Sequence, residues 1–194
     1  MGITVRKVDE RSQLAQKQIA EIVLDAYWEQ ISLLCSNRAK MIEAMQTGYN
    51  AEFFYIAYDG EDAVGVAACS PPGSRAVTVD PEYICRVLGN ELGPMASEIM
   101  KSEFGTPLDF GPDSSYIEFV GTVKIAQGKG VASAITKAIL ETTPYKRLVL
   151  EVVDTNTAAI RLYTKFGFKE FERKAEENPE QTGISYRIYM EYIR

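Results

Sequence analysis

Apolar residues recur along the first third of the chain at two spacings, which distinguish helices from strands. From Ser12 they return every three, four or seven positions, the period of a helix with one buried face. Asn37 precedes a second helical pattern and is a favoured capping residue. The pair Asp59-Gly60 is typical of a hairpin turn. The pattern predicts a strand at 3–8, helices at 12–34 and 38–46, and strands at 53–58 and 63–69.

The pattern is densest from residue 116 onward. Pro144 interrupts one helical pattern, and Gly167 ends another. Residues 147–153 are nearly all apolar, which is typical of a strand buried on both faces. The predicted elements are a strand at 116–123, a helix at 128–142, a strand at 147–153, a helix that begins at Thr155 or Asn156, and strands at 168–173 and 185–192.

Residues 70–112 differ in composition from the rest of the chain. Six of the eight prolines lie here: Pro71, Pro72, Pro81, Pro94, Pro107 and Pro112. Helical patterns occur within it near 81–88 and 92–104. The segment is too short to form its own core, so we interpret it as an insertion into a single domain that spans residues 1–194. Connections of this length usually carry function.

Composition excludes several classes of protein. The 194 residues are 46% hydrophobic and 25% charged, as in an ordinary globular protein. The formal net charge is −6, which excludes the basic surface of a general nucleic-acid binder. The chain contains no histidine, so catalytic triads and metal sites built on histidine are excluded as well.

The cysteines and the lack of long apolar runs favour a cytoplasmic protein. Cys35, Cys69 and Cys85 are odd in number and form no Cys-x-x-Cys, so neither a disulfide framework nor a thiolate metal site is indicated. The first ten residues lack the apolar core of a signal peptide. No stretch approaches the roughly 18 apolar residues of a membrane span. We therefore expect a cytoplasmic protein with no metal, no membrane association and no nucleic-acid partner.

Candidate chemistry concentrates in residues 127–133, QGKGVAS, between a predicted strand and a predicted helix. Glycines there let the backbone approach a ligand closely, and the free N–H groups of the first helical turn point at it. Such a helix start binds anions, pyrophosphate above all. Residues 121–140 hold three lysines and no acidic residue, so the local charge also favours an anion.

The loop by itself leaves three readings open. A Walker phosphate loop needs G-x-x-x-x-G-K-[ST], which is absent. A dinucleotide-binding fingerprint needs a third glycine where Ser133 stands, although Glu151 or Asp154 lies at the distance of its acidic partner. That motif also comes late, with one further buried strand to follow. The third reading is a tight strand-to-helix connection that binds nothing.

A second motif follows at residues 156–168, NTAAIRLYTKFGF. Asn156 and Tyr163 are seven residues apart, two helical turns, and so share one face of the predicted helix. Asn156 is also suited to cap that helix. Tyr163 either faces a ligand from this helix or is simply a half-buried aromatic residue of the core.

Together the two motifs resemble the GNAT superfamily of N-acetyltransferases. QGKGVA is similar to the family's acyl-CoA pyrophosphate motif, Q/R-x-x-G-x-G/A, and residues 156–168 resemble its second signature. The resemblance implies an α/β (α+β) fold with a mixed, mostly antiparallel central sheet and helices on both faces. The strands at 116–123 and 147–153 would be parallel and splay apart, and pantetheine would enter the gap. The insertion at 70–112 would shape the acceptor side.

The resemblance also implies an acetyl-CoA site. The backbone of Thr122 and Lys124 would contact the acyl and pantetheine groups, residues 127–133 the pyrophosphate, and Asn156 and Tyr163 the pantetheine and sulfur. One departure is that the family's V-x-P before the loop is missing here. The implied cofactor-binding residues are Thr122, Val123, Lys124, Gln127, Gly128, Lys129, Gly130, Val131, Ala132, Ser133, Asn156 and Tyr163.

Two residues are the predicted catalytic groups. Tyr163 would protonate the departing thiolate. Glu118 would take the proton of the amine, because it stands in an otherwise apolar strand and, at a period of two, shares a face with Thr122. The alternative for Glu118 is a solvent-facing position.

The resulting hypothesis is an N-acetyltransferase that uses acetyl-CoA and a primary amine of a small molecule or peptide, by direct attack on the thioester. The protein would act as a monomer or homodimer. The rival hypotheses are an acyl-CoA-binding sensor without turnover and a nucleotide-binding oxidoreductase.

Overall fold

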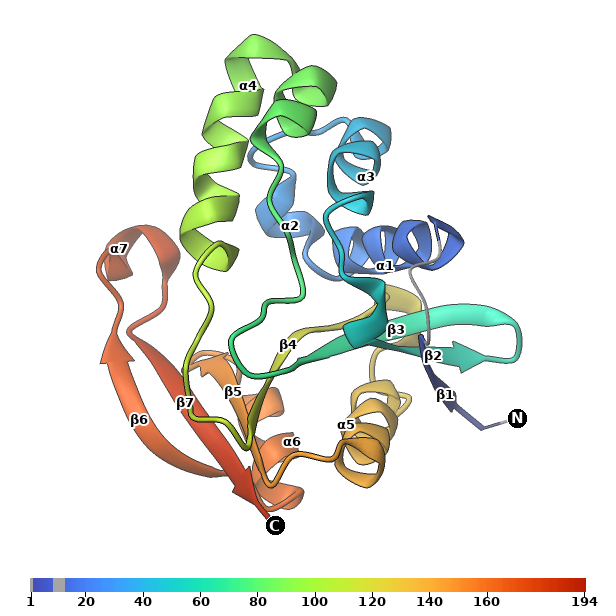
Figure 1. Cartoon of the computed structure of the whole chain (residues 1–194), viewed down its shortest axis with the longest axis vertical. Coiled ribbons are helices and arrows are strands. Elements are labelled where there is room, and N and C mark those ends of the chain that lie inside the picture. The colour runs from blue at the N-terminus through green and yellow to red at the C-terminus, as the bar shows by residue number, and fades with distance from the viewer. Residues whose placement is uncertain (1, 9–12) are drawn as a thin grey trace.

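Seven strands form one sheet in the computed structural model, which describes residues 2–8 and 13–194 (Figure 1). The strand order is β1-β2-β3-β4-β5-β7-β6, and only β4 and β5 are parallel neighbours. This confirms the predicted mixed, mostly antiparallel fold. The strands are β1 Thr4–Lys7, β2 Phe54–Asp59, β3 Asp62–Ser70, β4 Ser114–Thr122, β5 Arg147–Val153, β6 Lys169–Ala175 and β7 Tyr186–Ile193.

Helices cover both faces of the sheet (Figure 1). One layer contains α1, α3 and α4, and the other contains α5 and α6. The short helices α2 and α7 and the 3-10 turns η1 and η2 lie in connections. The bounds are α1 Gln13–Ala26, α2 Trp28–Ile31, α3 Arg38–Gln46, η1 Ala51–Phe53, α4 Pro81–Phe104, η2 Lys124–Ala126, α5 Val131–Thr142, α6 Thr157–Lys165 and α7 Pro179–Thr182.

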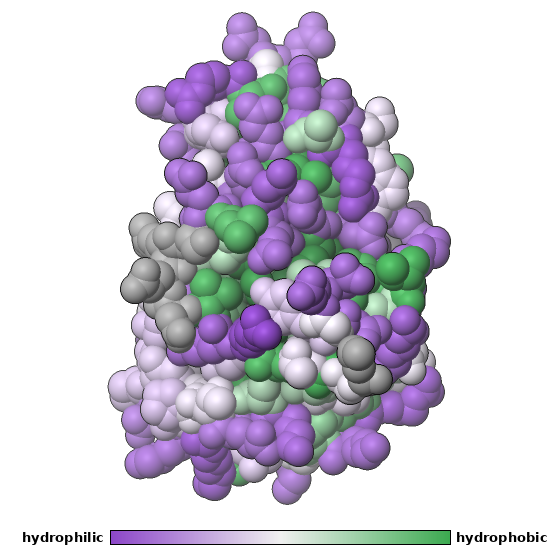
Figure 2. Space-filling view, turned by 90° about the vertical axis from the view of Figure 1, so that its right-hand side faces the viewer, coloured by the Kyte–Doolittle hydropathy of each residue, from purple (hydrophilic) through white to green (hydrophobic). Residues whose placement is uncertain are grey.

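Strand β2 shows how one sheet supports two cores. Phe54 and Ile56 are buried under α1 and α3, while Tyr55 and Ala57 are buried on the face that α5 covers. Successive side chains of a strand point to opposite faces, so a run of apolar residues fills both layers. Each large apolar side chain buried in this way contributes about 1.5–3 kcal/mol. The surface on the right-hand side of the view in Figure 1 is mostly hydrophilic, with hydrophobic side chains in small groups (Figure 2).

Two predicted helices have different bounds in the structure. The helix predicted at 12–34 is interrupted at Tyr27, whose φ of −115° and ψ of 21° leave the helical region; Ser12 lies outside the described residues. The helix predicted from Gly128 begins instead at Val131. Gly128 and Gly130 have φ of +77° and +82°. These left-handed values are incompatible with a right-handed helix, so the helix starts only after Gly130.

The insertion forms two helical stretches, as predicted, within α4. They are joined at Gly89, whose φ of 86° and ψ of 173° are not helical. The two halves fold back on one another, since a Cβ added to Gly93 would lie 2.4 Å from the Cα of Cys85. The insertion leaves β3 at Ser70 and returns to β4 beside it, because Ser70 is paired with Tyr116.

The parallel pair separates partway along its length. β4 and β5 are in register from Ser114 with Arg147 to Ile117 with Leu150, although both strands continue further. β4 has a bulge at this point, since its residues 118 and 121 pair with Ala68 and Val66 of β3.

The bulge overturns one expectation. Phe119 has a φ of +56°, and three residue steps on β4 match two on β3 between Glu118 and Gly121. The alternation of faces is therefore reversed beyond Phe119. Glu118 and Thr122 do not share a face, and the prediction that they do is wrong.

We expect Gly65→Ala to destabilise the fold. A Cβ at Gly65 would lie 2.4 Å from Cγ1 of Val131 and 3.1 Å from the carbonyl oxygen of Gly121, so α5 would have to move away from β3. Overpacking of this kind costs about 1–3 kcal/mol. Urea unfolding measures the loss. The matched control is Gly2→Ala, where no atom lies within 4 Å of the new Cβ; equal stability of the two variants would contradict the expectation.

Candidate active site

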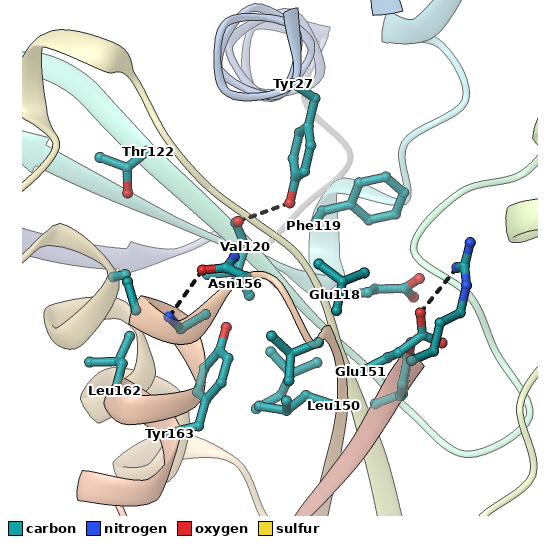
Figure 3. A pocket seen from close by; sticks show the side chains of 18 of the residues that line it. Tyr27, Glu118, Phe119, Val120, Thr122, Leu150, Glu151, Asn156, Leu162 and Tyr163 are labelled. Carbon is teal, nitrogen blue, oxygen red and sulfur yellow. Dashed lines mark hydrogen bonds and ion pairs between the residues drawn. The ribbon is translucent and has the colours of Figure 1, made fainter. Parts of the chain in front are cut away.

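A cavity of about 1130 Å³ lies where β4 and β5 separate (Figure 3). It is lined by the ends of these two strands, the glycine loop with the start of α5, the helix α6, and residues 102–108 of the insertion. Pockets for one small ligand usually measure roughly 300–1,000 Å³. The cavity therefore has room for a cofactor together with a second substrate.

The glycine loop presents backbone to the cavity. Gly130 is the N-cap residue of α5, and no side chain caps that helix. A Cβ added at Gly128 or Gly130 would meet no atom within 4 Å, so both glycines face open space. The N–H groups of a first helical turn and the positive end of the helix dipole favour an anion at this place.

Tyr163 and Asn156 lie together on α6 and line the cavity, as their spacing predicts. Tyr163 is buried and points into the gap (Figure 3). Burial raises the pKa of the Tyr163 hydroxyl above its ordinary value of 10.0, so the group is protonated at neutral pH and is able to donate a proton. The side-chain oxygen of Asn156 accepts a hydrogen bond from the N–H of Ala159 at 3.1 Å and so caps the helix.

The end of β4 has fewer free donors than the resemblance implies. The N–H of Lys124 donates to Oδ2 of Asp25 at 3.0 Å, and the N–H of Val123 donates to the carbonyl of Val64 at 3.0 Å. A ligand would have to displace these acceptors to reach either N–H group. Of the predicted cofactor-binding residues, the cavity is lined by Thr122, Gln127, Gly128, Gly130, Val131, Ala132, Ser133, Asn156 and Tyr163, and not by Val123, Lys124 or Lys129.

Glu118 also lines the cavity, but its carboxylate is fully engaged. Oε1 accepts hydrogen bonds from the hydroxyl of Ser70 at 2.6 Å and the N–H of Ala76 at 2.8 Å. Oε2 accepts from Nε and Nη2 of Arg75 at 3.0 and 2.9 Å. A carboxylate offers about four acceptor positions. A proton on Glu118 would therefore have to displace one of these donors.

Arg75 connects Glu118 to the insertion. Its guanidinium donates to the carbonyl oxygens of Thr106 at 2.9 Å and Glu103 at 3.3 Å, in the segment that lines the cavity. The ion pair between Arg75 and Glu118 is buried. Breaking a buried ion pair by removing one partner is strongly destabilising. The pair thus fixes the wall formed by residues 103–106 against β4.

The sequence interpretation missed a second carboxylate in the cavity. Glu151 of β5 lies where that strand leaves β4, and its Oε1 is 3.1 Å from Nη1 of Arg187. Arg187 also contacts Glu103 at 3.4 Å and Glu176 at 2.7 Å. Glu151 could have been found from the sequence, because it is an acidic residue within a nearly all-apolar strand. The sequence interpretation considered it only as a possible ligand of a ribose.

Tyr27, which follows α1, is a further aromatic residue of the candidate site. It lines the cavity, and its hydroxyl donates to the carbonyl oxygen of Val120 at 2.9 Å (Figure 3). Burial raises the pKa of Tyr27 to about 12. The interruption of the helical pattern at this residue is caused by its place in the tertiary structure, which no local pattern indicates.

Within residues 2–8 and 13–194, no group of three or more acidic or cysteine side chains is arranged to hold a metal ion. The same residues include no helix that is both long and apolar enough to cross a membrane.

Comparison with known proteins identifies one family. The model of the acetyltransferase (GNAT) family matches residues 20–168. No curated protein matches the chain.

Solved structures agree in fold. An N-acetyltransferase from Staphylococcus aureus Mu50 is 18% identical, with a TM-score of 0.63 over 97% of this chain and 100% of that one. A structure described as histone acetyltransferase HPA2 and related acetyltransferase, from Corynebacterium glutamicum ATCC 13032, is 21% identical, with a TM-score of 0.64 over 98% and 96%. The ribosomal-protein-S18-alanine N-acetyltransferase of Escherichia coli is 15% identical, with a TM-score of 0.56 over 98% and 93%.

We expect Gly130→Glu to weaken acetyl-CoA binding far more than Gly130→Gln. Both variants place a side chain at a left-handed φ and carry the same backbone strain, so they differ in one negative charge at the helix start. Calorimetric titration should give at least about tenfold weaker binding for the glutamate variant, a difference of about 1.4 kcal/mol. Equal affinities would mean that the phosphates lie elsewhere.

Proposed function

Because the chain belongs to the GNAT family of acetyltransferases, we propose that it transfers the acetyl group of acetyl-CoA to the nitrogen of a primary amine by direct attack on the thioester. The observation that carries the proposal is the continuity of the cavity. It reaches from the glycine loop, past the hydroxyl of Tyr163, to a second end walled by the insertion. A cofactor and an acceptor can therefore meet beside one proton donor.

The two ends of the cavity suit two different molecules. At one end, Gly128, Gly130 and the start of α5 offer backbone to a pyrophosphate, and the gap between β4 and β5 suits the extended pantetheine arm. GNAT acetyltransferases use acetyl-CoA as their co-substrate. At the other end, Glu103, Glu118 and Glu151 outnumber Arg75 and Arg187, so the lining favours a cationic acceptor over an anionic one.

The proposed reaction needs a proton acceptor before it needs a proton donor. An alkylamine has a pKa of about 10.4, so roughly one molecule in a thousand is neutral near pH 7.4. The neutral nitrogen bonds to the carbonyl carbon, the C–S bond breaks, and the nitrogen releases its second proton to the base or to water. The thiolate takes the proton of Tyr163, and the proton released from nitrogen restores the tyrosine through solvent. The backbone N–H groups near Thr122 would stabilise the oxyanion that forms in between.

Two carboxylates compete for the role of the base. The sequence prediction names Glu118, which stays a prediction; its two oxygens already accept four hydrogen bonds from Ser70, Arg75 and Ala76. Glu151 is paired with Arg187 at 3.1 Å and stands on β5 beyond the point where β4 and β5 separate. Either carboxylate would act directly or through a water molecule.

The proposal also covers the acceptor, the cellular compartment and the oligomeric state. The acceptor is the amine of a small molecule or of a peptide, and the insertion at 70–112 selects it, as the cavity lining at residues 102–108 supports. We place the reaction in the cytoplasm, where the three free cysteines would stay reduced. The protein would act as a monomer or a homodimer.

A panel of amines tests the proposal. The panel contains polyamines, aminoglycosides, amino acids and peptides with a free N-terminus or lysine, and the release of CoA thiol is followed with acetyl-CoA present. Thiol release with a mass increase of one acetyl group on the amine supports the proposal. Tight binding of acetyl-CoA without turnover on any amine would favour the sensor, and binding of NADH instead would favour the oxidoreductase.

We expect Tyr163→Phe to lower kcat by about ten- to a thousandfold while the KM for acetyl-CoA changes little, since the thiolate is already a fair leaving group. The raised pKa of Tyr163 adds a pH signature. The acid is active below its pKa, so the wild-type rate should show no fall from loss of this proton below about pH 10. Steady-state kinetics from pH 6 to 10 checks both points. Full kcat in the variant would remove Tyr163 from the mechanism.

The pair Glu118→Gln and Glu151→Gln identifies the base. A base must be deprotonated, so the rate falls on the acidic limb of the pH–rate profile as the base becomes protonated. Replacing the base should flatten this limb and lower kcat by about 10²- to 10⁴-fold. If Glu118 only holds Arg75, its variant should instead lower the melting temperature and raise the KM of the amine, with the limb intact. If both variants keep the limb, the amine loses its proton to bulk water.

A further inference from the structure

The C-terminal end of α1 is attached to β4 just beyond its bulge. The hydroxyl of Tyr27 donates to the carbonyl oxygen of Val120 at 2.9 Å. The neighbouring Ala26 packs on Gly121 so closely that a Cβ there would lie 2.9 Å from the Cβ of Ala26. This approach requires glycine at position 121 on β4.

A third contact extends the attachment past the end of β4. Oδ2 of Asp25 accepts a hydrogen bond from the N–H of Lys124 at 3.0 Å, and its Oδ1 is 3.1 Å from Nη2 of Arg38. Three consecutive residues of one helix end therefore hold the strand from the bulge to the turn that leads into the glycine loop.

The sheet holds this part of β4 on one side only. Beyond Ile117, β4 has no partner in β5, and it pairs with β3 again only after the bulge at Phe119, at Gly121 and Thr122. The left-handed φ of Phe119 is unfavourable for a residue with a side chain. Its ring packs against Phe104 and Tyr49, with centroids 4.9 and 5.8 Å apart, which leaves the backbone after it to be fixed by other contacts.

The backbone that α1 holds is the one that faces the gap. Val123 donates its N–H to Val64 of β3. Backbone groups of a strand alternate in direction from one residue to the next. The amide group of Thr122 therefore points away from β3, toward the cavity that this residue lines. It is a donor available to a thioester oxygen, and the carbonyl of Val120 nearby is a negative dipole that would repel that oxygen.

We propose that Tyr27 is a positioning residue for acyl transfer: its hydroxyl fixes the carbonyl of Val120 and so holds the gap-facing amide group of Thr122 ready for the oxyanion of the thioester. The proposal rests on the proposed function. The hydrogen bond does two things at once. It gives the Val120 carbonyl a donor, which weakens the repulsion between this carbonyl and the thioester oxygen. It also keeps the strand after the bulge in one conformation. Preorganised donors contribute to catalysis because they need not reorient during the reaction.

The test is Tyr27→Phe, with Tyr49→Phe as the matched control. Both changes remove only a hydroxyl, from Tyr27, which is half-buried, or from Tyr49, which is buried against Phe119, but the hydroxyl of Tyr49 has no hydrogen-bond partner among the described residues. We expect Tyr27→Phe to lower kcat by about three- to thirtyfold with the KM for acetyl-CoA unchanged. Tyr49→Phe should keep the wild-type kcat. Equal loss in both variants, or full kcat in Tyr27→Phe, would overturn the proposal.

Two readouts separate this proposal from the proposed function. Hydrogen exchange of the free protein should be faster at residues 119–123 in Tyr27→Phe alone, and unchanged exchange there would refute the positioning role. If wild-type protein acetylates no amine, the proposed function fails. Calorimetry with CoA and acetyl-CoA then decides: the positioning role requires Tyr27→Phe to lose the wild-type preference for acetyl-CoA over CoA, and an unchanged preference overturns it.

Discussion

Main-chain pairing between β4 and β5 stops after four residue pairs, and the candidate site exists because it stops. Buried N–H and C=O groups need partners, so two strands that separate inside a protein must find other ones or leave room for a ligand. β5 continues along β7 on its other side, from Arg147 with Ile193 to Val153 with Arg187. β4 stays paired with β3 on its other side, and the carbonyl of Val120 accepts a hydrogen bond from Tyr27. The cavity occupies the space that the missing ladder leaves.

Local signals in the sequence were sufficient for most of the fold. Asn156 and Gly167 act within a few residues of themselves, at a helix start and a helix end, so they predicted where α6 begins and ends. The helix expected from Gly128 begins instead at Val131. Residues 147–153 were predicted with the bounds that the structure shows, because a strand buried on both faces has an unbroken apolar run. Helical spacing brought Asn156 and Tyr163 to the same cavity, with Asn156 as the N-cap residue and Tyr163 within α6.

The remaining features depend on contacts between distant parts of the chain. Nothing in the run Tyr-Ile-Glu-Phe-Val-Gly-Thr marks Phe119 as left-handed, since its φ is set by aromatic packing against residues of β2, α4 and the segment before η1. Glu118 meets Arg75 across 43 positions of sequence. Such partners are invisible to periodicity. That is why the sequence located Glu118 and Glu151 in strands but could not assign what each carboxylate contacts.

The insertion begins and ends at neighbouring positions of the sheet, since Ser70 of β3 is paired with Tyr116 of β4. A segment that leaves and returns at one cross-strand pair can change in length or shape without altering the register of the strands that carry it. The glycine loop and α6 lie after this point in the chain and contribute to the opposite layer. The architecture thus keeps the segment that walls one end of the cavity apart from the glycine loop and α6, which wall the other end, so the two walls can vary independently of each other.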